Sequence, residues 1–271
     1  MPGSTSTAVA ATLRTTSRFS RPAQRIRSHR EWPKSAAERT IGINTYFDIE
    51  TGPLPLADRI LHRPTEATIK WGALKDPVKR QKKLDAAIEA FDAGDGCALS
   101  PMTGQVLVIG LVKGGKDVEF IHGGTEADML CEFWREVDVL FGPVIGFNSN
   151  SFDVPFLVKR SWILGVDIPV KSLEDALRRY PQHWMDLRER WNWGDKYAPG
   201  KLSVICGTLG ITVKDSPVDA AVFWLHWAKE PETCLEYLRQ DVEAVRQFAG
   251  RIGVPGAGSD AAMAMAPEPE F

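Results

Sequence analysis

The feature that most constrains this chain is an apolar run that ends in two acids. The run extends from Thr40 to Phe47, and Asp48 and Glu50 follow it with Ile49 between them. Its β-branched and aromatic residues predict a strand over 41–49. Because strand side chains alternate between two faces, both carboxylates are expected on one face at the strand's end. Two like charges held so close repel, so one would take a proton unless a positive group lies nearby.

The order of the other expected elements predicts an α/β domain over 41–252, with an insert at about 55–103. Strands mixed with helices, and a hairpin early in the chain, predict a mixed sheet flanked by helices, with the active site at strand ends. The expected strands lie at 105–112, 117–122, 143–148 and within 182–187. The expected helices lie at 75–91, 125–140, 152–164, 201–210, 217–228 and 231–252.

The two ends of the chain differ in composition from the middle. Residues 1–40 carry eight Arg and Lys against two Asp and Glu. This composition predicts a disordered basic leader, and it also fits a mitochondrial or plastid transit peptide. Residues 253–271, rich in Ala, Gly and Pro, are predicted to be a disordered tail. The four cysteines form no CxxC pair, which favours a reducing compartment such as the cytoplasm.

Further acids follow apolar runs elsewhere in the chain. Asp153 comes after the strand expected at 143–148 and opens the next helix, while Tyr237 and Asp241 lie four apart on the last helix and share a face. Taken singly, an Asp at a helix start is usually a cap, and a Tyr–Asp pair is usually packing plus a surface charge. Together with the first two acids, however, these side chains would converge on one edge of the sheet.

These residues resemble the three motifs of the DnaQ-like 3′–5′ exonuclease superfamily in its DEDDy form. The third motif has its tyrosine form, because Glu236 stands where the histidine form needs His. The segment 145–157 is most similar to the exonuclease domain of family B DNA polymerases and its stand-alone relatives. The resemblance covers about 41–252 and implies a ribonuclease H-like mixed five-stranded sheet flanked by helices. The matching segments are Asp48-Ile49-Glu50, Asn148-x-x-x-Phe152-Asp153 and Tyr237-x-x-x-Asp241.

The resemblance implies hydrolysis from the 3′ end of DNA, preferably single-stranded, with two Mg²⁺ or Mn²⁺ ions as cofactors. It implies that Asp48 bridges both ions, that Glu50 and Asp241 bind the ion nearer the nucleophile, and that Asp153 binds the other through water. Tyr237 would orient the attacking water, since a phenol with an ordinary pKa near 10 is a poor base. Hard, oxygen-rich sites select such ions, which would supply the missing positive charge.

Further roles are expected near these motifs. Thr51 is expected to meet the terminal nucleotide, Asn148 to support the site, and Phe152 either to stack on a base or to belong to the core. Asp186, at the end of the last expected strand, is either a cleft residue or a surface charge. The tryptophans of 184–193 and 224–227 are expected to be structural. The basic run in the insert is either a guide for a nucleic-acid backbone or a solvated helix face, and consists of Lys75, Lys79, Arg80, Lys82 and Lys83.

Three alternatives remain open from the sequence. An exoribonuclease of the same superfamily would use the same chemistry, and an inactive nucleic-acid-binding module would keep the fold without the metals. A nucleotide-binding metabolic enzyme is disfavoured, because the chain contains neither GxGxxG nor GxxxxGK[ST]. The chain ends soon after the third motif, so the exonuclease is expected to act alone or through a replication or repair partner. No apolar run approaches the roughly 18 residues that span a bilayer.

Overall fold

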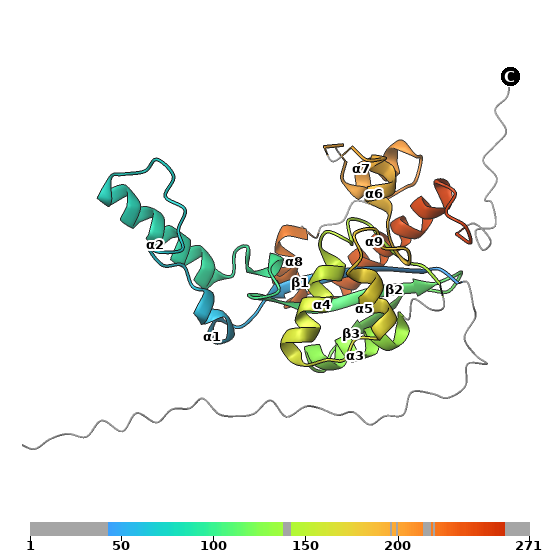
Figure 1. Cartoon of the computed structure of the whole chain (residues 1–271), viewed down its shortest axis with the longest axis horizontal. Coiled ribbons are helices and arrows are strands. Elements are labelled where there is room, and N and C mark those ends of the chain that lie inside the picture. The colour runs from blue at the N-terminus through green and yellow to red at the C-terminus, as the bar shows by residue number, and fades with distance from the viewer. Residues whose placement is uncertain are drawn as a thin grey trace, which may run out of the picture. The chain divides into compact units, whose positions relative to one another are not determined.

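The computed structural model describes residues 43–257 apart from 138–141, 196, 199, 214–217 and 219. The predicted leader and residues 258–271 of the predicted tail lie outside the described residues. One five-stranded sheet has the order β3-β2-β1-β4-β5 (Figure 1). Its strands are β1 (Thr45–Pro53), β2 (Gly104–Lys113), β3 (Glu119–His122), β4 (Val144–Gly146) and β5 (Trp184–Asp186).

The sheet is mixed, as predicted. β2 pairs antiparallel with both β1 and β3, so β2 and β3 form the predicted hairpin. β4 pairs parallel with both β1 and β5. The predicted fold class, a mixed five-stranded sheet flanked by helices, is therefore confirmed.

Helices cover both faces of this sheet and also form the connection between β1 and β2. Four helical segments lie in that connection: α1 (Leu56–Arg59), η2 (Ile60–His62), α2 (Pro77–Ala93) and η3 (Cys97–Leu99). The middle of the chain contributes α3 (Glu126–Glu136), α4 (Asp153–Leu164), α5 (Val170–Ala176) and α6 (Leu187–Asn192). The last part contributes α7 (Leu202–Thr208), η4 (Ala220–Val222), α8 (Phe223–Trp227) and α9 (Pro231–Arg251). Among the described residues, no helix has both the length and the apolar character needed to cross a membrane.

The alternation of β1 divides its side chains between two hydrophobic cores. Phe47 and Ile49 belong to the core formed with α3 and α4, where rings of Phe133 and Trp184 lie within 6 Å of the Phe47 ring. Tyr46 belongs to the other core, formed with α7, α8 and α9. Asp48 and Glu50 have the same parity as Tyr46, so the fold directs both carboxylates to the α9 side of the sheet.

The first strand differs from its predicted bounds of 41–49. Residues 41 and 42 lie outside the described residues, and β1 continues past both acids to Pro53 because Thr51, Gly52 and Pro53 pair with β2. Only Thr45 and Tyr46 pair with β4, however. The prediction that the acids end a strand is therefore wrong, because β1 continues past them. The acids do lie beyond the last residue of β1 that pairs with β4.

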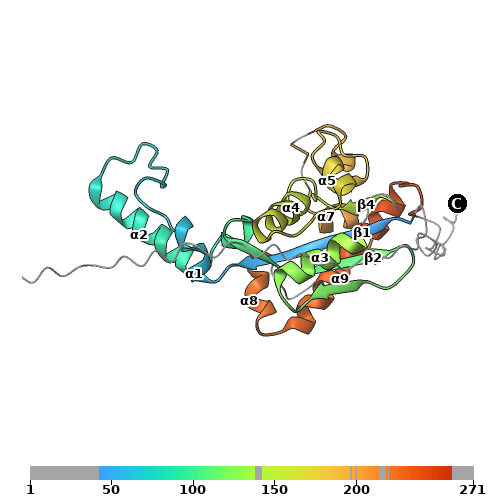
Figure 2. The same cartoon turned by 60° about the horizontal axis from the view of Figure 1, so that its bottom comes forward.

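Two packing details fix the position of β1 against its neighbours. The register with β2 shifts between Glu50 and Thr51, a β-bulge at the acids themselves. Gly110 lies opposite Asp48 on β2, and a Cβ there would approach Leu238 and Val242 of α9 to 2.9 Å. The absence of a side chain at Gly110 therefore allows α9 to lie close over β1 and β2 (Figure 2).

Three further differences from the sequence predictions concern helices and the tail. α5 and α6 were not predicted, and α3 ends at Glu136, short of the predicted 140, although 138–141 lie outside the described residues. Val254 is buried, and the Asn44 side chain donates to the Pro255 carbonyl at 3.0 Å. The packed part of the chain therefore extends into the first residues of the predicted tail.

Candidate active site

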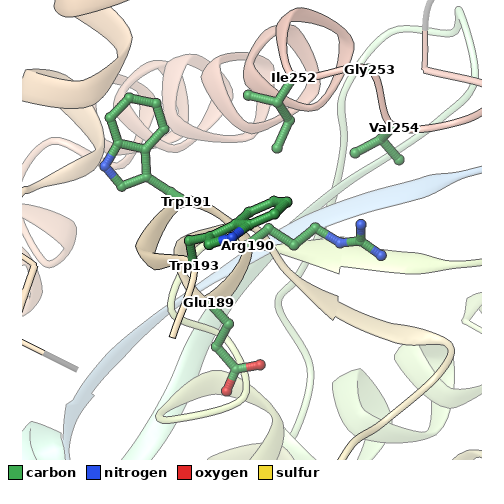
Figure 3. A pocket seen from close by; sticks show the side chains of 7 residues that line it. All are labelled: Glu189, Arg190, Trp191, Trp193, Ile252, Gly253 and Val254. Atoms are coloured by element: carbon green, nitrogen blue, oxygen red, sulfur yellow. The ribbon is translucent and has the colours of Figure 1, made fainter. Parts of the chain in front are cut away.

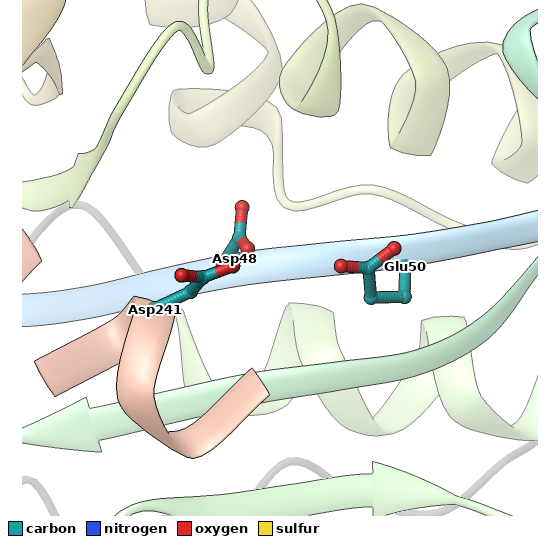
Figure 4. Close-up of side chains that lie close together, drawn as sticks. All are labelled: Asp48, Glu50 and Asp241. Atoms are coloured by element: carbon teal, nitrogen blue, oxygen red, sulfur yellow. The ribbon is translucent and has the colours of Figure 1, made fainter. Parts of the chain in front are cut away.

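Three of the predicted carboxylates gather where α9 crosses β1. Asp48, Glu50 and Asp241 each place a carboxylate oxygen within 4.8 Å of the others (Figure 4). Asp48 and Glu50 come from the same face of β1, and Asp241 reaches them from α9. Asp48 and Asp241 are half-buried and Glu50 lies at least as deep, so the three carboxylates are recessed into the protein.

Asp153 joins this group from a third segment. It is the first residue of α4 and is only 5% exposed, and the backbone N–H of Ile49 donates to its carboxylate. Its charge acts on both Asp48 and Glu50. The structure thus brings together all four predicted acids from β1, α4 and α9.

Burial raises the pKa of all four acids. Burial is the largest cause throughout, and it raises the pKa of Asp153 to about 7 and that of Asp241 to about 6. Burial, followed by the neighbouring carboxylates, holds the pKa values of Asp48 and Glu50 well above their ordinary range. Within the described part of the chain, none of the four forms an ion pair with Lys, Arg or His.

Tyr237 lies one turn before Asp241 on α9, as predicted, and the two groups are near enough that each affects the pKa of the other. Burial, and then the charges of Asp241 and Glu50, raise the pKa of Tyr237 above its ordinary value. The phenol therefore remains protonated at neutral pH. It can donate a hydrogen bond in the site but cannot act as a general base.

Asp186 lies inside the protein near Asp153, whose pKa its charge raises. It is 3% exposed, so it is not a surface charge, and its carboxylate accepts three backbone N–H groups, from Asn148 at 2.8 Å, Asn150 at 3.0 Å and Arg188 at 2.8 Å. It caps α6 and at the same time holds the turn that leads into Asp153. Asp186 is thus a positioning residue for the loop before α4.

Replacing Asp186 by Asn is expected to destabilise the protein by about 2 kcal/mol. The amide keeps one acceptor oxygen but turns an NH₂ group toward buried N–H donors, and a buried donor without a partner costs about 1–3 kcal/mol. Urea unfolding followed by circular dichroism measures the change. Asp195→Asn is the matched control, because Asp195 accepts one N–H, from Tyr197, at an exposed site. A loss no larger than that of the control would contradict the role given to Asp186.

The three other predicted residues lie beside the acids. The Thr51 hydroxyl donates to the Ala98 carbonyl at 2.8 Å, so its proton is already committed to the protein. Asn148 has a left-handed backbone (φ 61°), which Asn tolerates better than most residues, and its carbonyl accepts from Ser151 and Phe152. The Phe152 ring is half-buried against Phe156, with ring centroids 5.5 Å apart.

The tryptophans, predicted to be structural, do not all lie in the core. Trp184 is buried, but Trp193 is 91% exposed because α6 ends before it and its backbone turns left-handed (φ 49°). Trp191 and Trp193 border a cavity of about 480 Å³ between the end of α6 and the residues after α9 (Figure 3). None of the predicted site residues lines this cavity.

The chemistry of the donor set fits a divalent metal ion. Four carboxylates supply only oxygen, which Mg²⁺ and Mn²⁺ prefer, and they lack a neighbouring cation that would hold them ionised. Asp48, Glu50 and Asp241 are close enough together to hold an ion. Cys206 is a soft ligand near Asp241. Burial, followed by the charge of Asp241, raises the pKa of its thiol to about 11, and this disfavours the thiolate that would bind a metal.

The chain matches a family model over about half of its length. This model, described as "Predicted 3'-5' exonuclease related to the exonuclease domain of PolB", matches residues 105–244. This match runs from β2 into α9 and includes Asp153, Tyr237 and Asp241, whereas Asp48 and Glu50 precede it.

Two individual proteins are similar over parts of their length. DNA polymerase 2 of Aeropyrum pernix is 30% identical over 99 residues, which cover 35% of this chain and 12% of the polymerase. The solved structure of the family B DNA polymerase of Pyrobaculum calidifontis is 16% identical with a TM-score of 0.48, covering 78% of this chain and 24% of the polymerase chain. The chain thus spans only a small part of the length of either polymerase. On the family match, it belongs to the family of predicted 3′–5′ exonucleases related to the exonuclease domain of PolB.

Proposed function

We propose that this protein is a metal-dependent 3′–5′ exonuclease that removes nucleotides from the 3′ end of single-stranded DNA. The observation that carries the proposal is the meeting of Asp48, Glu50, Asp153 and Asp241, from three segments of the chain, on one side of the sheet. Divalent ions bound by such carboxylates supply an activated water and stabilise the charge that develops on a phosphodiester.

The proposed roles follow from the position of each side chain. Asp48 lies among the other three carboxylates and is proposed to bridge two ion sites, with Glu50 and Asp241 as ligands of one and Asp153 as a ligand of the other. Tyr237 is proposed to orient the attacking water through its phenol O–H, because its raised pKa keeps that proton in place. The Asp241 carboxylate lies near the same phenol, one turn along α9.

DNA is proposed as the substrate because the similar protein of Aeropyrum pernix is named DNA polymerase 2. The family itself is described by its relation to the exonuclease domain of PolB. The test is digestion of 3′-labelled single-stranded DNA and of RNA of the same sequence, each with Mg²⁺, Mn²⁺ or EDTA. An Asp48→Ala, Glu50→Ala double variant runs alongside as the inactive control, with folding checked by circular dichroism.

Each outcome of this digestion decides between the open alternatives. Metal-dependent shortening of DNA from its 3′ end, lost in the double variant, would support the proposal. Shortening of RNA alone would keep the chemistry and make the protein an exoribonuclease. No hydrolysis of either by folded, metal-loaded protein would contradict the proposal and favour the binding module.

The metal-free protein is expected to lose stability as the pH rises from about 4 to about 7. The four carboxylates have folded pKa values above their ordinary ones, with Asp241 at about 6 and Asp153 at about 7. In that window the folded state holds more protons than the unfolded state, so the free energy of unfolding falls as the pH rises, by a few kcal/mol in all. Thermal unfolding in EDTA across this range measures the effect.

Added Mg²⁺ or Mn²⁺ is expected to raise Tm more at about pH 8 than at about pH 6, because the ions must displace the same protons. This measurement needs no nuclease activity. The Asp48→Asn, Glu50→Gln double variant is the control and should show both a flatter pH dependence and a smaller metal effect. A Tm that responds to metal equally in the wild type and the variant would place the binding elsewhere.

A further inference from the structure

The connection between β1 and β2 carries a basic surface that the proposed chemistry does not use. Residues 55–96, here called the arm, contain α1, η2 and α2 and precede the residues matched by the family model. Within the arm, residues 63–83 hold seven Lys and Arg against two Asp and Glu. In Figures 1 and 2 the N-terminal end of α2 and the loop before it lie away from the sheet, whereas the C-terminal end of α2 lies toward it.

The arm is held in shape by contacts at its base. The buried Arg59 guanidinium donates to the carbonyls of Phe91 and Asp92 at 3.0 Å each and also to that of Leu54. Arg63 forms a two-pronged ion pair with Asp92. These bonds fix α1 and η2 against the C-terminal end of α2, so the arm is a defined element joined to the strand that carries Asp48 and Glu50.

One face of α2 is occupied by the preceding loop. Arg80 lies over the Trp71 ring, 5.2 Å from its centroid, and donates to the Leu74 carbonyl at 2.7 Å. Lys83 donates to the Lys70 carbonyl at 2.7 Å. These two cations are therefore used in holding the loop on the helix.

Beside the residues that hold the loop, the arm presents lysines that the fold does not use, here called the lysine face. Lys75, Lys79 and Lys82 are exposed, and no carboxylate of the described residues pairs with their ammonium groups. Lys79 and Lys82 are three apart and share one side of α2, and Lys75 lies two residues before the helix begins. Of the two acids in 63–83, Asp76 is occupied, because it caps α2 by accepting from the N–H groups of Val78 and Lys79.

Helix stability does not account for these lysines. The N-terminal end of a helix carries a partial positive charge, so a cation in the first turn is unfavourable. Asp76 at the cap offsets part of this charge, but the first turn itself contains no acid and does contain Lys79. A surface of this kind instead fits a polyanion, whose phosphates give contacts that position a strand without reading its sequence.

We infer that the lysine face binds the phosphate backbone of the DNA strand upstream of the 3′ end held by the carboxylates. The identity of this ligand rests on the proposed exonuclease function. α2 has 17 residues and so spans about 25 Å at about 1.5 Å per residue. At about 3.4 Å per nucleotide of a stacked strand, the lysines would meet phosphates about six or more nucleotides from the scissile bond. The arm would therefore act on long strands only.

The test compares two triple variants of the full-length protein. The arm variant carries Lys75→Ala, Lys79→Ala and Lys82→Ala, and the control variant carries Lys116→Ala, Lys159→Ala and Lys171→Ala, which removes the same charge from exposed sites outside the arm. Binding of a fluorescent oligothymidylate of about thirty nucleotides is measured by anisotropy in EDTA over a range of KCl concentrations. Oligouridylate of the same length is measured in parallel.

The arm variant is expected to bind the oligothymidylate about ten- to a hundredfold more weakly at moderate salt, with a salt slope smaller by about 2. The control variant should bind like the wild type. Equal losses in both variants, or none in either, would overturn the inference, and a loss confined to oligouridylate would overturn the assignment to DNA.

A second readout separates this inference from the proposed function. Thymidine 5′-(4-nitrophenyl phosphate) is a small phosphodiester that reaches the carboxylates but not α2. The arm variant should hydrolyse it at the wild-type rate, and a large loss there would mean that the substitutions disturb the catalytic site instead of a remote contact. If the wild type hydrolyses neither this ester nor DNA, the proposed function fails, whereas the binding comparison still decides what the arm does.

Discussion

Replacing Asp48 by Asn is expected to abolish hydrolysis while raising the stability of the metal-free protein. Asp48 lies among Glu50, Asp153 and Asp241, and its pKa is raised first by burial and then by those three charges. Without a metal ion, this arrangement opposes folding above the ordinary pKa of a carboxylate. An amide of the same shape removes one of the repelling charges, so the free energy of unfolding should rise by roughly 1–3 kcal/mol at about pH 8.

The same substitution removes the ligand proposed to join both ion sites. The rate of DNA hydrolysis should fall by about a thousandfold or more, which corresponds to roughly 4 kcal/mol of transition-state stabilisation. Single-turnover hydrolysis and thermal unfolding in EDTA measure the two effects on one sample. Opposite signs of the two changes are the signature of a residue kept for catalysis at the expense of stability.

Asp117→Asn is the matched control, because Asp117 is an exposed acid in the turn between β2 and β3. It should leave both rate and stability unchanged. An Asp48→Asn protein that is less stable than the wild type in EDTA would show that the carboxylate has a structural partner. An Asp48→Asn protein that keeps its hydrolysis rate would remove Asp48 from the site.

Replacing Gly110 by Val is expected to cost about 3 kcal/mol of stability and to reduce hydrolysis by about a hundredfold. A Cβ at this position would lie 2.9 Å from both Leu238 Cγ and Val242 Cγ2, which are attached close to the backbone of α9 and cannot swing away. Val favours strands by up to about 1 kcal/mol, which is too little to offset the overlap. α9 must therefore shift outward, and Asp241 and Tyr237 move with it, away from Asp48.

The expected effect on Asp241 can be measured apart from the effect on folding. Addition of Mg²⁺ or Mn²⁺ should raise the Tm of the variant by less than it raises the Tm of the wild type, because the carboxylates no longer meet. Gly207→Ala is the control, since a Cβ there meets nothing within 4 Å. A Gly110→Val protein with wild-type stability and metal response would show that α9 does not depend on this close approach.

The sequence by itself determined most of the elements and the identity of the candidate site. The helix periodicity of 231–252 and the Pro at its start predicted α9 closely, and the Gly-containing turn predicted the hairpin of β2 and β3. Tyr237 and Asp241 could be placed on one face because helical spacing is local geometry. The two acids of β1 could be placed together because strand alternation is local as well.

Tertiary structure decided the features that depend on distant partners. The first strand was predicted to end at 49, before Gly52 and Pro53, which are residue types that usually interrupt strands. Pairing with β2 nevertheless continues β1 through both residues. The sequence left Asp186 as a surface or cleft acid, and only the meeting of β5 with the 148–150 turn buries it and adds two N–H donors to the local one of Arg188. The role of Gly110 is equally invisible in sequence, because it depends on how closely α9 approaches. Periodicity reports which way a side chain points from its own backbone, whereas burial, pKa and hydrogen bonding depend on what the rest of the chain places in front of it.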